Sequence, residues 1–205
     1  KGISYYVPDK VITNDDLSKL MDTSDEWIRT RTGIEQRYSV GDTGLGPTDL
    51  AVQATELVLK KTKTKKEEID FVVFATSTPD YFVPGAGSLF QDKMGLNNIG
   101  VLDIRQGCSG FVYGLSVADQ YIKSKMYKNV LVIGAEVQTT QLDFDTEGRG
   151  TAIIFGDGAA SALLTSTDSA GKGILSSHLH SDGKFINELG TLVPSPKIKG
   201  LINNQ

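Results

Sequence analysis

The sequence has only one cysteine, Cys108, and only two histidines among its 205 residues. A single cysteine cannot build an internal disulfide framework, and this fits a reducing compartment. No apolar run approaches the ~18 residues of a membrane-spanning helix, and no secretory signal-peptide pattern opens the chain. We therefore expect a cytoplasmic protein that does not cross a membrane.

A large excess of charge of either sign is also missing. The chain has 21 Lys and Arg against 25 Asp and Glu, a net charge of -4. This balance gives no general attraction to nucleic acid or to anionic membranes, so we expect neither as a partner. We interpret a lysine cluster as the solvated end of a helix, where cations suit the dipole; a docking patch for an acidic carrier protein is the less favoured alternative. The cluster is Lys60, Lys61, Lys63, Lys65 and Lys66.

Apolar runs of strand length alternate along the chain with helical patterns. Continuous apolar runs predict strands that are buried on both faces, as in a parallel sheet. Their alternation with helices predicts an α/β protein with helices on both faces of the sheet. The expected central strands are 71–75, 99–104, 129–137 and 159–164, with a further strand at 3–7.

Capping residues give the expected helix boundaries. Thr13 and Asn14 predict the start of a helix that runs through Met21, and Thr23 and Ser24 predict the start of the next. Thr48 and Asp49 are expected to cap a longer helix. Its predicted buried face contains Leu50, Ala54, Leu57 and Val58. A further helix is expected from Ala86 to Met94, ended by Gly95.

Cys108 is expected at a junction between a strand and a helix. Gly107 and Gly110 bracket it and favour a sharp turn, after which a helical pattern begins at Phe111. The amides and dipole at a helix start favour the reactive thiolate form of cysteine. The flanking glycines also allow a ligand or another chain to come close to the backbone. A buried, unreactive cysteine is the alternative.

Two other features could serve a ligand with phosphates. Trp27 and Arg31 lie four residues apart and hence on one helix face. Such a pair can hold a flat base and a phosphate, or it can be a tryptophan packed on its neighbour's stem. Arg149, between Gly148 and Gly150, is either a phosphate ligand or a surface residue in a turn.

Alternation from 173 to 182 predicts a half-buried strand that places His178 and His180 on one face. The pair could bind a metal or act as a base for Cys108, but no third ligand follows at regular spacing. We therefore favour a structural role and expect no metal site. The turn at 156–158 is also expected to be structural.

Three segments together resemble the beta-ketoacyl-acyl-carrier-protein synthase III family. They are Asp25 to Ile34, with its Trp-x-x-x-Arg-Thr-Gly-Ile string, the surroundings of Cys108, and Phe155 to Ala160. The resemblance covers nearly the whole chain. It implies a thiolase-like α/β fold with a mixed, largely parallel sheet and helices on both faces. Residues 1–170 would be the first of two similar halves, and 171–205 the start of a connection to the second.

The resemblance also implies an activity and its residues. Cys108 would take a short acyl group from acyl-CoA and condense it with malonyl-acyl-carrier protein, releasing CO2, in the first condensation of fatty acid synthesis. Trp27, Arg31 and Arg149 would bind coenzyme A, which is a substrate, so that no cofactor is expected. Phe82, Val83 and Phe155 would shape the acyl pocket. A homodimer is expected, with the apolar loop from Tyr81 to Pro84 near its interface.

The chain departs from the family pattern in one major respect. The family's catalytic histidine and asparagine match no position here, so we expect that the sequence is incomplete and that a chain ending at Gln205 does not catalyse condensation. Two alternatives remain open. One is another cysteine-dependent acyl-CoA acyltransferase or hydrolase that pairs Cys108 with His178 or His180. The other is a half-domain that is not catalytic and acts through protein contacts.

Overall fold

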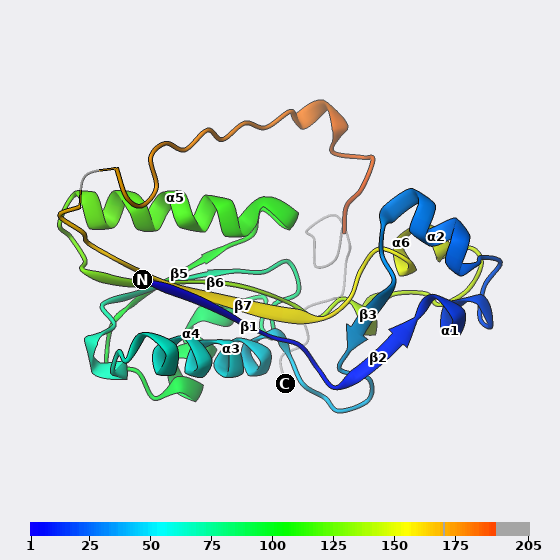
Figure 1. Cartoon of the computed structure of the whole chain (residues 1–205), viewed down its shortest axis with the longest axis horizontal. Helices are drawn as coiled ribbons and strands as arrows, with labels where there is room; N and C mark the ends of the chain where they lie inside the picture. The colour runs from blue at the N-terminus through cyan, green and yellow to red at the C-terminus, as the bar shows by residue number, and fades with distance from the viewer. Residues whose placement is uncertain (170, 192–205) are drawn as a thin grey trace.

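A computed structural model describes residues 1–169 and 171–191, and its centre is a five-stranded sheet (Figure 1). The strand order is β1-β7-β6-β4-β5. The strands are β1 (Gly2–Tyr6), β4 (Phe71–Ala75), β5 (Gly100–Ile104), β6 (Asn129–Glu136) and β7 (Gly158–Thr165). All five strands expected from the apolar runs are therefore present.

The sheet is mixed but largely parallel, as predicted. β4 pairs in parallel with both β5 and β6, while β7 runs antiparallel to both β6 and β1. Four strands consequently share one direction and β7 alone is reversed. β4 and β6 are buried, as continuous apolar runs require. β5 is an edge strand with half-buried side chains, so its prediction as a fully buried strand was wrong.

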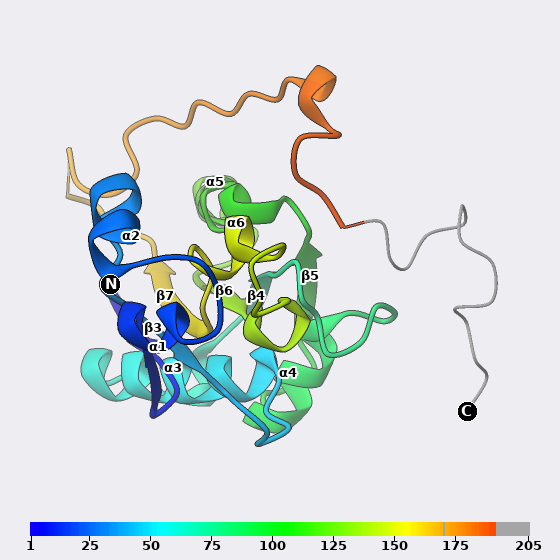
Figure 2. The same ribbon diagram turned by 90° about the vertical axis from the view of Figure 1, so that its right-hand side faces the viewer.

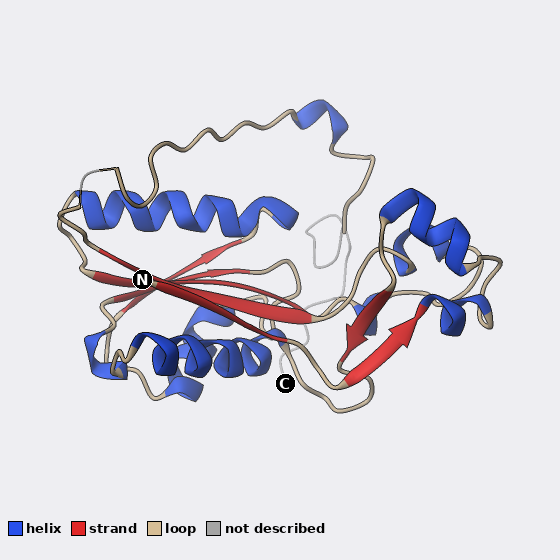
Figure 3. Cartoon of the chain, in the orientation of Figure 1, coloured by secondary structure: helices blue, strands red, loops and turns tan. Residues whose placement is uncertain are grey.

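Helices cover both faces of this sheet (Figure 3). α3 (Pro47–Thr62) and α4 (Ala86–Met94) lie on one face, and α5 (Gly110–Lys123) lies on the other. The α3 and α4 side holds the larger core, which includes Phe74 and Phe90 with ring centroids 5.6 Å apart. The two-sided arrangement confirms the predicted α/β class.

α5 lies unusually close to its sheet at one residue. A Cβ atom added to Gly114 would come within 2.9 Å of Val132 Cγ1, so that only glycine fits without a shift. Phe71, Val73, Val130 and Val132 form the core beneath the helix with Ala118. Packing at this distance fixes the height of α5 above β4 and β6.

A smaller lobe stands beyond the carboxyl ends of the parallel strands, at the right of Figure 1. A two-stranded antiparallel sheet and three helices form it, around a core of Leu17, Met21, Ile28, Ala152 and Ile153. Its elements are β2 (Lys10–Thr13), α1 (Asn14–Ser18), α2 (Asp25–Thr32), β3 (Gln36–Ser39) and α6 (Arg149–Ala152). Four short turns of 3-10 helix complete the description: η1 (Lys66–Glu68), η2 (Gly107–Ser109), η3 (Thr139–Gln141) and η4 (Gly183–Phe185).

The predicted helix starts hold for α1, α2 and α4 and fail for α3. Thr13 caps α1 and Ser24 caps α2 through side-chain oxygens. α1 ends at Ser18 rather than Met21. α3 is capped by Gly46, whose amide donates to the Asp49 side chain, so that the predicted cap at Thr48 and Asp49 lies inside the helix.

Leu57 is 46% exposed, against its predicted place on the buried face of α3. The buried arc of the helix is centred on Ala51, Ala54 and Thr55, and Leu57 lies beyond its margin. None of the described helices is long and apolar enough to cross a membrane.

The strand predicted at 173–182 is absent from the structure. These residues form an extended segment without strand pairing, and most of their side chains are exposed. A strand needs a neighbouring strand for its backbone hydrogen bonds, and alternation in sequence does not supply one. The expected connection at 171–205 is described only as far as residue 191, because 192–205 lie outside the described residues.

Candidate functional site

Cys108 lies where the sequence analysis placed it, between β5 and α5. It occupies η2, which runs directly into α5, and its side chain is exposed. The carboxyl ends of β4 and β5 meet at this edge, since the Thr76 amide donates to the Ile104 carbonyl at 3.1 Å. The carboxyl edge of parallel strands is where open α/β sheets place their ligands. The cysteine is therefore accessible and stands at the start of a helix.

The two glycines around Cys108 have different roles. Gly107 has φ +52°, a left-handed conformation that favours glycine and makes the sharp turn. Gly110 is buried, and a Cβ atom there would meet Ala75 Cβ at 3.2 Å. Its close neighbour is thus the chain's own strand β4, which corrects the expectation that this glycine admits a ligand or another chain.

The loop between β4 and α4 lies beside the cysteine segment. Asp103 of β5 accepts hydrogen bonds from the amides of Ala86 and Gly87, at 2.7 and 3.0 Å, and so fixes the start of α4. Arg105 reaches back over this loop, and its Cζ lies 4.5 Å from the centre of the Phe82 ring. Phe82 is 51% exposed and Val83 is 76% exposed. The loop thus presents apolar side chains close in space to Arg105, which precedes Cys108.

Trp27, Arg31 and Arg149 come together in the smaller lobe. The Cζ of Arg31 lies 4.2 Å from the centre of the Trp27 ring, and the Cζ of Arg149 lies 4.9 Å from it. Arg31 follows Trp27 by one turn of α2, whereas Arg149 begins α6. We call these three residues the Trp27 cluster. Two cations beside one aromatic ring suit a flat base that carries phosphates.

The surroundings of the Trp27 cluster hold Arg149 in place. Arg149 Nη1 donates to the carbonyl of Asp22, and the Asp22 amide donates to Thr146 Oγ1 at 3.0 Å. Trp27 is half-buried and packs on the core of the small lobe, while Arg31 is exposed. In Figures 1 and 2, α6 lies at the same end of the main sheet as the beginning of α5. The cluster and Cys108 therefore both lie on the side of the main sheet where the parallel strands end.

The three residues expected to shape an acyl pocket lie on two separate segments. Phe82 and Val83 are on the loop after β4, and Phe155 lies between α6 and β7. Phe155 is half-buried, and none of the three belongs to the described core clusters. The pocket itself stays a prediction.

Asp157 has a structural role that the sequence analysis only suggested. Its carboxylate is buried and accepts hydrogen bonds from the amides of Val40, Gln138 and Thr139, and from Thr139 Oγ1 at 2.6 Å. It therefore joins the end of β3, the segment after β6 and the start of β7. The turn at 156–158 binds protein groups, as expected for a structural turn.

Glu136 was missed in the sequence, where it appears as one polar residue at the end of an apolar run. Its carboxylate accepts hydrogen bonds from the Ser77 amide at 2.7 Å and from Thr78 Oγ1 at 2.7 Å. It thereby holds the first residues of the loop that carries Phe82. A charged residue as the last residue of an apolar strand was the only available signal.

The histidines do not form the strand pair that alternation predicted. His178 and His180 are both exposed, and His178 Nε2 lies 3.2 Å from Ser176 Oγ, a local contact. Within residues 1–169 and 171–191, no group of three His, Cys, Asp or Glu side chains is placed to hold a metal ion. The structure gives no support to a site built on the two histidines.

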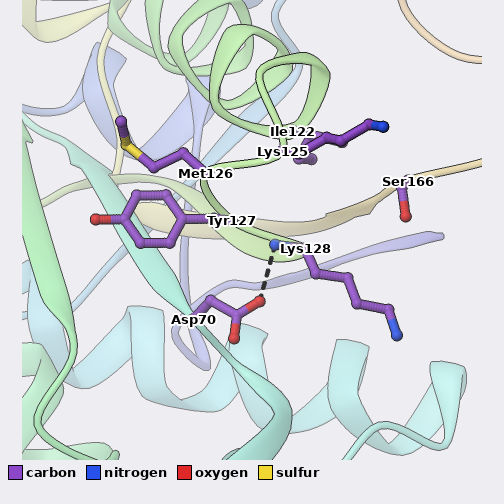
Figure 4. A pocket seen from close by; sticks show the side chains of 7 residues that line it. All are labelled: Asp70, Ile122, Lys125, Met126, Tyr127, Lys128 and Ser166. Atoms are coloured by element: carbon purple, nitrogen blue, oxygen red, sulfur yellow. Dashed lines mark hydrogen bonds between the residues drawn. The ribbon is translucent and has the colours of Figure 1, made fainter.

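A hollow at the amino-terminal ends of the parallel strands is separate from Cys108 and the Trp27 cluster (Figure 4). It has a volume of about 350 Å³ and lies where β4 and β6 begin. The Asp70 carboxylate there accepts hydrogen bonds from the amides of Lys128 and Asn129, at 2.9 and 2.8 Å. Asp70 is thus engaged with backbone, which indicates a structural role for it.

The family model and the sequence relatives that match this chain both carry the name synthase III. The family model of 3-oxoacyl-[acyl-carrier-protein (ACP)] synthase III matches residues 102–183, which include Cys108 and Arg149. A beta-ketoacyl-[acyl-carrier-protein] synthase III from Ehrlichia canis is 45% identical over 190 residues. That alignment covers 93% of this chain and 59% of the relative.

Solved structures agree with the sequence relatives. Synthase III structures from Thermus thermophilus and Pseudomonas aeruginosa superpose with TM-scores of 0.87 and 0.86, each at 35% identity. Each match covers 96% of this chain and 60% of the solved chain, so the chain spans less than two thirds of the relatives' length. The fold is therefore thiolase-like. The chain belongs to the beta-ketoacyl-[acyl-carrier-protein] synthase III family.

Proposed function

We propose that the protein is an acyltransferase that starts fatty acid synthesis. It loads a short acyl group from acyl-CoA onto Cys108 and condenses that group with malonyl-acyl-carrier protein, which gives a 3-oxoacyl-acyl-carrier protein and CO2. One observation carries this proposal: an exposed cysteine at a helix start and the Trp27 cluster both lie on the side of the main sheet where the parallel strands end. The names of the relatives support the reaction class.

The first step is transfer of the acyl group. The Cys108 thiolate attacks the thioester carbon, a bond forms between Sγ and that carbon, and the bond from the carbon to the coenzyme A sulfur breaks. Coenzyme A leaves as a thiolate and takes up the proton that Cys108 lost. Negative charge grows on the carbonyl oxygen during the attack, and in this proposal the backbone N–H of Cys108 donates a hydrogen bond that stabilises it.

The Trp27 cluster binds the nucleotide end of coenzyme A in this proposal. The Trp27 ring stacks on the adenine, and Arg31 and Arg149 contact the phosphates. Phe82, Val83 and Phe155 shape the space for the acyl chain. Acyl-CoA is consumed as a substrate and free coenzyme A is released, and the proposal requires no other cofactor and no metal.

The second step, condensation with the malonyl group, also needs residues beyond those of this sequence. Decarboxylation of the malonyl group builds negative charge on a thioester oxygen, which needs preorganised donors. The family's histidine and asparagine for this step match no position of this sequence. We propose that residues 1–170 form the first of two similar halves and that 171–205 begin the connection to the second. The expected cytoplasmic location stays a prediction.

We also propose that the protein is a homodimer. β5 is an edge strand, so one row of its backbone groups is free to pair, and the adjacent loop exposes Tyr81, Phe82 and Val83. Sedimentation velocity at high micromolar concentration is expected to give the mass of a dimer. A monomer under these conditions would contradict the proposal.

Acylation of Cys108 tests the proposed function. Incubation with acetyl-CoA is expected to raise the intact mass by one acetyl group, and peptide mapping is expected to place it on Cys108. Cys108→Ala is expected to remain unmodified. Equal labelling of the variant would show that Cys108 is not the nucleophile.

A further inference from the structure

A single buried side chain joins both ends of α2. Asn14 is 1% exposed, and its Nδ2 donates to Asp25 Oδ1 at 2.8 Å and to the Ile34 carbonyl at 2.7 Å. Asp25 is the first residue of α2, and Ile34 follows the C-cap residue Gly33. Both amide hydrogens of Asn14 are thus committed to the helix that carries Trp27 and Arg31.

Arg37 connects Asn14 to α6. Arg37 is 4% exposed. Its Nη2 donates to Asn14 Oδ1 and to the Ile153 carbonyl, each at 3.0 Å. Nη1 donates to the Ile12 carbonyl at 3.2 Å. Ile153 is the C-cap residue of α6, the helix that begins with Arg149. A continuous chain of hydrogen bonds therefore runs from α2 through Asn14 and Arg37 to α6.

Arg37 is a buried cation whose described acceptors are all neutral. It forms none of the ion pairs found in the described part of the chain, and its Nε has no partner there. Burial lowers the pKa of this guanidinium. A buried charge costs free energy unless directed hydrogen bonds offset the cost. An apolar residue at this position would leave Asn14 Oδ1 and the Ile12 and Ile153 carbonyls without these donors.

Apolar packing also joins α2 and α6, because Ile28 packs in one core with Ala152 and Ile153. Such packing is not directional, so it brings the helices together without fixing their relative rotation. Hydrogen bonds prefer near-linear geometry and do fix it. α6 has only four residues, and a small rotation about its C-terminal end moves Arg149 at its start.

We infer that Arg37 and Asn14 are positioning residues that hold Arg149 over Trp27. They touch neither the ring nor its ligand, and they act through the ends of α2 and α6. The use of this geometry for coenzyme A rests on the proposed function, whereas the geometry itself does not. The inference is therefore testable without any ligand.

Trp27 is the only tryptophan in the sequence, so fluorescence excited selectively in tryptophan, and not in the seven tyrosines, reports on this ring alone. Acrylamide quenching measures the accessibility of the Trp27 ring in a double-mutant cycle. The cycle compares the wild type, Arg37→Met, Arg149→Ala and the double variant. In the wild type, Arg149→Ala is expected to raise the quenching constant by about twofold, because it uncovers the ring. In the Arg37→Met background the same substitution is expected to raise it only slightly, because Arg149 is then no longer held over the ring. Lys60→Met is the control, because Lys60 is an exposed cation on α3, outside this network.

Titration with free coenzyme A forms the second arm. Arg37→Met is expected to weaken binding by about tenfold, because contacts in one network couple by energies of that size. Lys60→Met is expected to leave the dissociation constant unchanged. Alkylation of Cys108 by iodoacetamide is expected to keep its rate in both variants, which separates positioning from general unfolding.

The outcomes are distinct. If Arg149→Ala changes the quenching constant equally in both backgrounds, the positioning inference is wrong. If the effects are coupled but the wild type does not bind coenzyme A, the inference stands and the proposed function falls. If circular dichroism shows that Arg37→Met does not fold, Arg37→Lys and Asn14→Ala replace it in both the quenching experiment and the coenzyme A titration. Arg37→Lys keeps the positive charge but loses the planar guanidinium and its several donors. It is expected to abolish the coupling to Arg149→Ala in the quenching experiment, as Arg37→Met does, and to weaken coenzyme A binding less than Arg37→Met does.

Discussion

The guanidinium carbon of Arg149 lies 4.9 Å from the centre of the Trp27 ring, although most of the main sheet separates the two residues in sequence. With Arg31 on the same ring, the Trp27 cluster concentrates positive charge at one place. We predict that Arg149→Gln weakens coenzyme A binding and also reduces its sensitivity to salt, because screening acts on the charge that the variant removes. Fluorescence titrations at low and high ionic strength measure both effects.

Lys61→Gln, which removes an exposed cation at the end of α3, is the control for this experiment. It is expected to leave both the affinity and the salt dependence unchanged. A salt dependence that Arg149→Gln does not alter would exclude Arg149 as a phosphate contact.

The main sheet could be predicted because its signals are local. The continuous apolar run at 71–75 is sufficient for a buried strand, and the capping side chains of Thr13 and Ser24 mark their helix starts. The strand predicted at 173–182 failed because alternation describes only which side chains would share a face. A strand also needs a partner for its backbone, and no local pattern provides one.

The candidate site could be predicted in part. The spacing of Trp27 and Arg31 within one helix placed them together, and the approach of Arg149 came only from the family resemblance. The bridge formed by Asn14 and Arg37 could not be predicted, because its contacts join α1, α2, β3 and α6. Nothing near Arg37 in the sequence indicates that a charged residue is buried there.

The buried carboxylate of Asp157 gives a prediction on stability. Asp157→Asn replaces one acceptor oxygen with a donor that faces backbone N–H groups. Hydrogen bonds to a charged group contribute about 1.5–3 kcal/mol each, so we expect the free energy of unfolding to fall by ~2–3 kcal/mol. Urea unfolding measures the change, with the exposed Asp168→Asn as control. A loss no larger than that of the control would contradict the structural role.

The contact between Arg105 and Phe82 gives a prediction on acyl specificity. A cation over an exposed ring contributes about 0.5–1 kcal/mol, enough to bias the position of the loop after β4. We expect Arg105→Ala to change the ratio of Cys108 acylation rates for acetyl-CoA and a longer acyl-CoA by about threefold. In the Phe82→Leu background the same substitution is expected to have little effect. Independent effects of the two substitutions would show that the contact does not shape the pocket.

The ion pair between Lys93 of α4 and Asp49 of α3 gives a prediction on pH. Burial raises the pKa of Asp49, but hydrogen bonds from Lys93, at 2.6 Å, and from the Gly46 amide outweigh it and lower the pKa below 3.8. A lowered folded pKa stabilises the protein above the unfolded value, and this contribution disappears as the pH falls through the folded value.

Lys93→Met removes the cation from this pair, together with the hydrogen bond from Lys93 Nζ to Thr48 Oγ1 at 3.0 Å. Between about pH 6 and about pH 3, the wild type is therefore expected to lose more stability than Lys93→Met, by up to about 1 kcal/mol for a pair this exposed. Thermal unfolding across this range measures the difference. Parallel losses in the two proteins would show that the pair contributes nothing to acid stability.

The central claim is that the Trp27 cluster delivers an acyl group to Cys108 by binding the nucleotide end of coenzyme A. The most direct test compares the acetylation rate of Cys108 in the wild type and in Trp27→Ala, with acetyl-CoA or with S-acetyl-pantetheine, a thioester without the nucleotide. Loss of a base stack costs about 1–3 kcal/mol, so Trp27→Ala is expected to slow acetylation from subsaturating acetyl-CoA by at least about fivefold. The rate from S-acetyl-pantetheine is expected to stay the same. Equal slowing with both donors, or no slowing with acetyl-CoA, would contradict the claim.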